Sequence, residues 1–584
     1  MTGKITSISI IRNRDKEELF RGRGDRITEL FAARIATRSS VSFREETSDL
    51  ILEICADASV EGQGYRISGE GNRITVSAST SEGLLAGLGK FLHTTVYCKD
   101  GICPSGWRGT SVPTSLLRGI QLDTHFCNYY HMAPAEELKE YVYDLAFQGV
   151  NVLDIVFPLI DLLGWEDPEI GHITGQIRAI YEAASETGLS VGLEIVPNQD
   201  FVNQRKEFAA SPNVEVIRKR GNNGHNMCPN KPGALRYITD TYSRVVKHLH
   251  NNGIVLDYLC FWPYDEGGCG CELCRPWGAN GFLKAGKAIL DEVRKDFPQM
   301  KAILSTWLFD AQQDEGEWSG IAERFSEKEN CWPEYILADN HTDFPQYPLT
   351  HPIPGNLPLI NYPEISMWAL YPWGGYGANP LPKRFERLWK QVKHIVRGGI
   401  AYSEGIFDDV NKMVVSQFYW NADTTADNSL HEYVNYWVGA DVCEDVCEAI
   451  NIIEDNHVKT AVGIGKVVAR DCNTHATTPE IHAAALHAWE LMRKADAKLP
   501  KWAAEGWRWR ILYLRAMFDE LRFRRALEQM DHLAENATWT EVLRGSEEAR
   551  EGMRELVRIY HSNMDYDDTI HPMYHHVRPA LDEI

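Results

Sequence analysis

The sequence has no uninterrupted apolar run approaching the roughly 20 residues of a membrane-spanning helix. Its first residues, 1–14, also lack the long apolar core of a secretory signal peptide. Basic residues are in the minority, since 60 Lys and Arg stand against 82 Asp and Glu, and the formal net charge is −22. A negative charge of this size repels phosphate backbones and anionic lipids, which argues against nucleic acid and membranes as partners. We therefore expect a cytoplasmic protein that acts on a small molecule.

A pattern of paired cysteines is also missing. The 13 cysteines are an odd number and lie scattered along the chain, apart from one cluster, so they do not resemble a disulfide framework. This usage fits a reducing compartment and agrees with the predicted cytoplasmic location.

The chain is too long for a single domain, because its 584 residues with 44% hydrophobic content exceed what one core usually organises. Residues 1–112 alternate short strand-like runs with helical stretches, which predicts a small α+β domain. The last part of this segment and the residues that follow, 99–115, contain Gly, Ser and two prolines, and their composition is typical of a linker.

From residue 117 onward, an apolar strand-like run followed by a polar helix recurs. Eight runs have the composition of buried strands: residues 117–123, 150–157, 189–197, 256–262, 302–309, 335–338, 357–361 and 399–403. Eight such strands with helical crossovers predict an α/β fold, a (β/α)8 TIM barrel, which we place at residues 113–425. The alternative is an open doubly wound sheet, but no Gly-x-Gly-x-x-Gly motif follows the first strand.

Strand signals stop after residue 423, and the remaining segments have helical periodicity. Residues 426–584 therefore predict a helical C-terminal domain. Its expected role is to pack against the barrel or to form the interface of a homodimer.

An adjacent carboxylate pair, Asp265 and Glu266, follows the fourth predicted strand. The carboxyl ends of barrel strands carry the active site, so this position favours a catalytic interpretation. Repulsion between the two carboxylates, together with partial burial, is expected to raise the pKa of one of them, which suits a general acid.

Further carboxylates and aromatic residues follow the other predicted strands. Glycoside hydrolysis needs a carboxylic acid, a second carboxylate or a substrate group that supplies the nucleophile, and flat aromatic faces for a sugar ring. Glu194 and Asp310 are interpreted as caps or solvated charges, and Trp262 as a packing residue. The candidate catalytic residues are Glu266, Asp265, Asp339 and Glu364, and the candidate substrate-binding residues are Asp123, His125, Tyr129, Trp307, Tyr362, Trp368, Trp373 and Glu404.

Several segments resemble known glycoside hydrolases. Residues 50–92, with Gly64-Tyr65-Arg66-Ile67 and the glycine-containing run 83–87, resemble the small domain that precedes the barrel in family 20 β-N-acetylhexosaminidases and family 67 α-glucuronidases. Residues 117–123, together with 133–138 and 149–151, are similar to the first barrel repeat of hexosaminidases. The resemblance covers about residues 50–440 and implies a glycoside hydrolase.

The two families imply different mechanisms for this chain. The hexosaminidase resemblance implies that Asp265 orients a substrate acetamido group, which attacks the anomeric carbon, while Glu266 is the general acid. The α-glucuronidase resemblance implies that Glu266 is again the acid, with Asp339 or Glu364 as the base of an inverting reaction. The separation of the carboxyl groups decides between retention and inversion.

We expect an exo-acting enzyme that cleaves a terminal sugar from an oligosaccharide or glycoside, since the long aromatic segment 368–382 can close over a single sugar. Two other classes are carried as alternatives. One is a non-catalytic carbohydrate-binding protein on the same scaffold, and the other is a zinc-dependent enzyme.

Three cysteines with C-x-C-x-x-C spacing, Cys269, Cys271 and Cys274, follow the carboxylate pair. With Cys228 they make a set of four thiols, and four thiolates are a typical closed structural zinc site. We expect zinc as a structural cofactor and no organic cofactor. The alternatives are buried free thiols or a redox-active pair.

Overall fold

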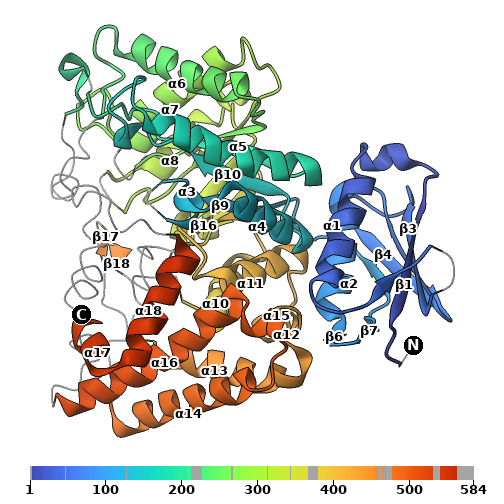
Figure 1. Cartoon of the computed structure of the whole chain (residues 1–584). Helices are drawn as coiled ribbons and strands as arrows, with labels where there is room; N and C mark the ends of the chain where they lie inside the picture. Colours follow the sequence, from blue (N-terminus) through green and yellow to red (C-terminus); the bar gives the residue numbers. More distant parts are fainter. Residues whose placement is uncertain are drawn as a thin grey trace.

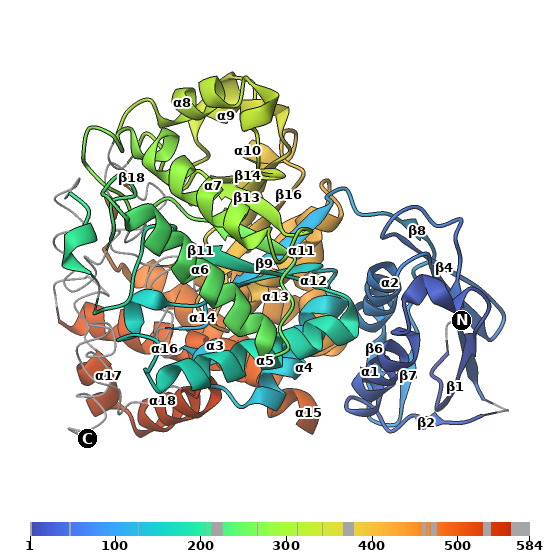
Figure 2. The same ribbon diagram turned by 90° about the horizontal axis from the view of Figure 1, so that it is seen from above.

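A computed structural model of the chain contains three regions that follow one another in the sequence (Figure 1). It describes residues 3–45, 48–125, 128–203, 205–211, 226–264, 267–311, 314–341, 343–365, 379–457, 463–464, 467–468, 476–529 and 539–561. Figures 1 and 2 show the N-terminal sheet region beside one flank of a central barrel and the C-terminal helices along another. None of the helices in these ranges combines the length and apolar character needed to cross a bilayer.

The N-terminal region is a six-stranded sheet with the strand order β2-β1-β3-β5-β4-β8. Helices α1 (Gly24–Ala36) and α2 (Ser81–Thr94) lie between this sheet and the barrel (Figure 1). The strands are β1 (Ser7–Asn13), β2 (Ser42–Phe43), β3 (Leu50–Ala56), β4 (Tyr65–Glu70), β5 (Arg73–Ala78) and β8 (Gly109–Ser111), and a separate hairpin is formed by β6 (Val96–Cys98) and β7 (Gly101–Cys103).

Helix α2 joins the sheet to the barrel. Thr80 caps it, because its side-chain oxygen accepts a hydrogen bond of 3.1 Å from the Gly83 amide. A Cβ at Gly83 would overlap the Gly64 carbonyl oxygen, and a Cβ at Gly89 would overlap the Phe147 carbonyl oxygen of the barrel. Most of the helix is therefore buried between two regions, which explains why its sequence has almost no polar face.

The central region is a closed barrel of eight parallel strands, and β16 pairs with β9 to complete it. This arrangement confirms the predicted barrel and excludes the open sheet. The strands are β9 (Leu117–Leu122), β10 (Val152–Val156), β11 (Ser190–Ile195), β12 (Tyr258–Phe261), β13 (Lys301–Ser305), β14 (Tyr335–Asp339), β15 (Leu359–Tyr362) and β16 (Gly398–Ser403).

Helices surround this barrel on its outer face (Figure 2). They are α3 (Tyr129–Met132), α4 (Ala135–Phe147), α5 (Glu169–Thr187), α6 (Ala234–Asn251), α7 (Gly281–Val293), α8 (Glu317–Arg324), α9 (Gln346–Thr350), α10 (Pro382–Val392) and α11 (Asp409–Trp420). Each long helix turns an apolar stripe toward the strands, as the 3.6-residue period requires.

The C-terminal region is helical, as predicted. Its helices are α12 (Ala426–Trp437), α13 (Cys443–Asp455), α14 (Pro479–Asp496), α15 (Lys501–Ala504), α16 (Trp507–Glu528), α17 (Trp539–Gly545) and α18 (Glu547–Tyr560). A two-stranded hairpin of β17 (Gly463–Ile464) and β18 (Val467–Val468) interrupts it, and the sequence pattern did not predict these short strands.

A chain of buried charges joins all three regions. Arg508 of α16 pairs with Asp409 of α11 at 2.7 Å and with Asp144 of α4 at 3.2 Å. Asp144 also pairs with Arg34 of α1 at 3.1 Å. Charges that are taken out of water need partners of opposite sign, so these contacts fix the relative placement of the regions.

Candidate active site

The carboxyl ends of the barrel strands bring polar and aromatic side chains together. Successive residues of a strand point to opposite faces, so Gln121 and Asp123 share the inner face of β9 and of its continuation. The same alternation gives Tyr402 and Glu404 the inner face at the end of β16. A side-chain contact confirms the inward orientation of Gln121, because its Oε1 accepts a hydrogen bond from the Tyr362 hydroxyl on β15.

Asp123 lies in a row of charged groups at the end of β9. Its Oδ1 is 2.7 Å from His125 Nε2, and Asp161 Oδ2 is 2.8 Å from His125 Nδ1. Burial disfavours the charged imidazole, but the two carboxylates outweigh it and raise the pKa of His125 well above its usual value. The mouth therefore holds an imidazolium between two carboxylates.

Tyr402 links this row to Glu404. Its hydroxyl donates to Asp123 Oδ2 at 2.9 Å and lies 2.6 Å from Glu404 Oε1. Burial and the two neighbouring carboxylates raise the pKa of Tyr402 well above its usual value, so it remains a donor. Asp123 and Glu404 are 2% and 4% exposed, which places both carboxylates in a shielded environment.

The backbone at Glu404 is held by the last described helix. Tyr560 of α18 donates a hydrogen bond of 3.0 Å from its hydroxyl to the Glu404 carbonyl oxygen. Its ring stacks on Phe407 with a centroid distance of 4.9 Å. A Cβ at Gly405 would overlap the Tyr560 hydroxyl, so glycine is needed at this point.

A second carboxylate pair, Asp339 and Glu364, lies at the ends of β14 and β15. Trp307 Nε1 donates to Glu364 Oε1 at 2.8 Å, and His341 Nδ1 pairs with Glu364 Oε2. Burial, and after it the nearby charge of Glu364, raises the pKa of Asp339 well above its usual value. Asp339 therefore retains its proton beside Glu364.

Aromatic rings line the same region. Trp262 lies 5.5 Å from Trp307 and 4.6 Å from Tyr362, measured between ring centroids, and Tyr362 lies 5.8 Å from Tyr402. Trp262 was expected to be a packing residue, and it is 5% exposed and packs within this aromatic group. Trp262 comes two residues after Cys260, and side chains two residues apart share one face of a strand, so both point to the barrel interior.

Glu194 also differs from its expected role as a solvated charge. It accepts a hydrogen bond of 2.8 Å from Gln121 Nε2, and Gln121 Oε1 accepts one of 2.8 Å from the Tyr362 hydroxyl. Glu194 lies on β11, where alternate side chains point to the barrel interior. Its inward orientation therefore follows from its place in the strand, and it does not cap a helix.

Tyr129, a predicted substrate-binding residue, begins α3 and is buried among aromatic rings. Its ring lies 6.1 Å from Tyr130, 6.0 Å from Tyr141 and 6.1 Å from His561. These are packing contacts, and the one with His561 joins the barrel to the C-terminal region. The predicted residues Asp265, Glu266, Trp368 and Trp373 lie outside the described residues.

Glu317 is a buried carboxyl that organises the loops after β12 and β13, and the sequence did not single it out. It accepts hydrogen bonds from the Tyr264 hydroxyl, the Gly278 amide and the Asp310 amide. Burial raises the pKa of Glu317 to about 7 in spite of these donors. Leu308 and Asp310 have left-handed backbone angles, φ 55° and 60°, and the contacts with Glu317 stabilise this strained turn.

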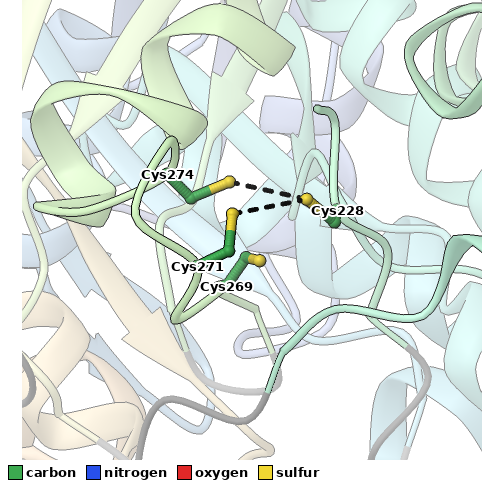
Figure 3. Close-up of side chains that lie close together, drawn as sticks. All are labelled: Cys228, Cys269, Cys271 and Cys274. Carbon is green, nitrogen blue, oxygen red and sulfur yellow. Dashed lines mark hydrogen bonds between the residues drawn. The ribbon is translucent and has the colours of Figure 1, made fainter. Parts of the chain in front are cut away.

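The four predicted metal ligands lie together (Figure 3). Cys228 comes from a separate segment and faces the loop that carries Cys269, Cys271 and Cys274. Cys228 Sγ is 3.7 Å from Cys271 Sγ and 3.8 Å from Cys274 Sγ, and all four sulfurs lie within 4.8 Å of one another. A tetrahedral ion with Zn–S bonds of about 2.3 Å has sulfurs about 3.8 Å apart, so the spacing fits zinc.

The protonation of these thiols is uneven. Burial raises the pKa of Cys228 to about 11, whereas a hydrogen bond from Cys274 lowers the pKa of Cys269 to about 5. A bound cation would supply the charge that the other sulfurs need in order to ionise.

Asn198 connects the cysteine loop to the barrel. Its Nδ2 donates to the carbonyl oxygens of Met227 and Gly268, each at 2.9 Å, and its Oδ1 accepts from the Gly268 amide at 3.2 Å. The segment before Cys228 and the segment before Cys269 are therefore tied to the end of β11.

No protein-family model matches the sequence, and no curated protein sequence is significantly similar to it. Several solved structures of glycoside hydrolases have a similar fold. A family 115 4-O-methyl-α-glucuronidase with specificity for decorated arabinogalactans gives a TM-score of 0.57 at 12% identity, covering 98% of this chain and 78% of that chain.

Two other structures are similar to a comparable degree. A family 89 enzyme from Clostridium perfringens, in complex with GlcNAc-α-1,4-galactose, gives a TM-score of 0.57 at 13% identity, covering 94% of this chain and 67% of that chain. A family 138 enzyme that targets the pectin rhamnogalacturonan II gives 0.54 at 10% identity, covering 94% and 74%. The chain thus has the TIM-barrel fold of these glycoside hydrolases, as its sequence resemblance implied.

Proposed function

We propose that the protein is an exo-acting glycoside hydrolase that removes a terminal sugar from an oligosaccharide or glycoside. The observation that carries this proposal is the set of buried carboxylates at the strand ends, among them Asp123, Asp339, Glu364 and Glu404, with tryptophan and tyrosine rings between them. Carboxyl groups with separated proton affinities and flat rings for a pyranose face are the requirements of glycosidic bond cleavage. The deep burial of these groups supports a site that admits one sugar.

The surroundings of Asp339 and Glu364 support different catalytic roles for the two carboxyl groups. Asp339 retains its proton because it is buried beside a negative charge, so it can donate a hydrogen bond to a sugar hydroxyl. Trp307 and His341 fix both oxygens of Glu364, which orients this carboxylate as the second catalytic group. In this scheme Glu266 protonates the leaving oxygen, and Glu364 activates water or attacks the anomeric carbon.

The alternative is a substrate-assisted reaction in which Asp265 orients an acetamido group and the substrate supplies the nucleophile. The similar structures include enzymes described for α-glucuronic acid and for N-acetylglucosamine substrates, so their fold is compatible with either mechanism. Substrate identity and product configuration together discriminate between the two mechanisms.

The test is a panel of aryl glycosides, with the anomeric configuration of the first product followed by NMR. We expect turnover of at least one terminal glycoside. Binding of glycans without turnover across the panel would contradict the proposal and favour a carbohydrate-binding protein.

Two variants separate the roles of the carboxylates. E266Q should lower kcat roughly 10²- to 10⁴-fold on aryl glycosides with a poor leaving group, and much less on dinitrophenyl glycosides, which need no protonation. E364Q should lower kcat on both classes of substrate. E329Q, at an exposed glutamate, is the matched control and should keep full activity. Near-normal activity of E266Q on poor leaving groups would exclude Glu266 as the acid.

We also propose that Cys228, Cys269, Cys271 and Cys274 bind a structural zinc ion. Four sulfur ligands leave no open coordination position, which separates this ion from the reaction and disfavours a zinc-dependent enzyme. Metal analysis of the purified protein should find zinc bound through these cysteines, and its absence would contradict the proposal. The cytoplasmic location and the homodimer stay predictions from the sequence.

A further inference from the structure

A second group of metal-ligating side chains lies in the C-terminal region, away from the loop that carries the four cysteines in sequence. His431 of α12 and Cys443 and Cys447 of α13 place one nitrogen and two sulfur atoms within 4.8 Å of one another. Cys443 and Cys447 are four residues apart on one helix, so both thiols lie on the face of α13 that meets α12. Their sulfur atoms are 4.0 Å apart.

The two ring nitrogens of His431 have different partners. Its Nδ1 lies 2.8 Å from the backbone oxygen of Asp427, one turn earlier in α12. A carbonyl oxygen can only accept a hydrogen bond, so Nδ1 carries a hydrogen and Nε2 is the nitrogen that an ion would use. Metal-binding histidines are commonly held in this way, with the second nitrogen donating to a backbone carbonyl.

The distances fit a tetrahedral ion. Zinc with bonds of about 2.3 Å to sulfur and 2.0 Å to nitrogen separates its ligand atoms by about 3.5 to 3.8 Å. The observed separation of the two sulfurs exceeds this by a few tenths of an ångström. The Cys443 thiol donates to the backbone oxygen of His431 at 3.6 Å, a weak contact that rotation of the side chain toward an ion would release.

A carboxylate lies where a fourth ligand is needed. Glu444 Oε1 is 3.3 Å from His431 Nε2, and the Glu444 side chain is 88% exposed, so it can reorient. Without an ion, a proton on Nε2 is shared with this carboxylate oxygen, and a cation that takes the place of the proton bonds to both groups. We propose that His431, Cys443 and Cys447 bind a second zinc ion, with Glu444 in the fourth, exchangeable position.

The two zinc sites differ in access. Cys228, Cys269 and Cys274 are 3% exposed or less, whereas the His431 side chain is 43% exposed. An ion held by three protein ligands and one exposed carboxylate exchanges faster than an ion enclosed by four thiolates. A moderate chelator should therefore remove the ion at His431 first.

The second site stabilises a contact between regions. Next to His431, Glu432 pairs with Lys90 of α2, and Asn435 Nδ2 donates to the His93 carbonyl oxygen at 2.6 Å. Metal binding holds α12 against α13 and thereby fixes the helix that meets the N-terminal region.

The experiment counts zinc in protein purified from zinc-supplemented culture and follows its release to a colorimetric chelator. We expect two ions per chain in the wild type, one released rapidly and one only after thiol modification or unfolding. The double variant C443S/C447S should keep one ion, the slow one. H431Q changes a half-exposed side chain and should lose the rapid ion without loss of fold, which covers the case in which the double variant does not fold.

H487Q is the matched control, because His487 is an exposed histidine on the adjacent helix α14 and pairs with Glu448 instead. It should retain both ions. Retention of the rapidly released ion in both H431Q and C443S/C447S would overturn the second site, as would a wild type with only the slow ion. C269S/C274S should lose only the slowly released ion, which assigns that ion to the four-cysteine site. Each zinc proposal can therefore be contradicted without affecting the other.

Discussion

Asp154 is a carboxyl group buried inside the barrel on β10, with 1% of its surface exposed. Burial raises the pKa of Asp154 to about 8, and only the Cys260 thiol and the Ile155 amide oppose this shift. Gly192 on the adjacent strand makes room for it, since a Cβ there would lie 2.6 Å from Asp154 Oδ1. The barrel interior therefore holds a neutral carboxylic acid at neutral pH.

The raised pKa predicts a pH-dependent stability. Between the pKa of the unfolded chain, about 4, and the folded value of about 8, the unfolded state loses its proton while the folded state keeps it. The contribution of Asp154 is thus fully present below pH 4 and is lost as the pH rises toward 8.

D154N should remove the part of the pH dependence of the free energy of unfolding that comes from Asp154, because an amide does not titrate. Between pH 5 and pH 8 the wild type should lose more free energy of unfolding than D154N, by on the order of 4 kcal/mol. Urea unfolding of both proteins at the two pH values measures this difference. Equal losses would show that Asp154 does not stay protonated in the folded state.

At the scale of single residues, the sequence predicted those candidate residues that end a strand with an inward-facing carboxylate or ring. Asp339 and Glu364 are such residues, and the structure brings them together. Glu317 could not be found in this way, because its importance comes from donors at Tyr264, Gly278 and Asp310, which are brought to it by the fold. Nothing in its local sequence distinguishes it from a solvated glutamate.

At the scale of elements, the loop after β12 is anchored to the rest of the structure at several points. Asn198 holds Gly268, Glu317 holds Tyr264 and Gly278, and the four cysteines join the loop to the segment around Cys228. The anchored residues Tyr264 and Gly268 flank Asp265 and Glu266 in the sequence. This anchoring predicts that the proposed zinc ion supports activity through loop placement rather than through chemistry.

Removing that ion should uncouple activity from folding. In C228S we expect loss of the slowly released zinc, at least a tenfold lower kcat, and an unchanged far-ultraviolet circular dichroism spectrum. Hydrogen exchange should speed up at residues 226–232 and 267–281 while the barrel strands stay protected. Full activity of the zinc-free variant would contradict a role of the ion in placing the loop.

The strands and long helices were predictable because their apolar periods are long enough to be distinctive. The fourth strand was predicted at 256–262 and is observed at Tyr258–Phe261, and Leu256 and Trp262 on either side of it are buried. The short strands β17 and β18 were not predictable, because two residues each carry no measurable period.

At the scale of the whole molecule, Arg508 and its partners hold the three regions together. Arg508 lies in a helix whose sequence, Trp507-Arg508-Trp509-Arg510, does not show which arginine is buried. In the structure Arg508 is 6% exposed and stacks over Trp437 at 3.6 Å, while Arg510 is only partly buried. The order of the regions was predictable from composition, but this contact depends on how they pack.

R508L should destabilise the protein by about 3 to 5 kcal/mol, because it leaves the buried carboxylates of Asp409 and Asp144 without their shared cation. R525Q on the same helix is the control, since the side chains of Arg525 and Glu528 are 41% and 55% exposed and their pair should contribute less than about 1 kcal/mol. Thermal and urea unfolding measure both. A similar small effect for the two variants would mean that the buried charges do not hold the regions together.

The contact of Tyr560 with the Glu404 backbone has a consequence for biosynthesis. The residue that closes the end of β16 lies 156 residues later in the chain than the carbonyl it holds. While the chain is still being translated, a complete barrel can emerge and fold before α18 exists. The mouth then has all of its strands but not its final support, so the proposed hydrolase activity should arise only after residue 560 has left the ribosome.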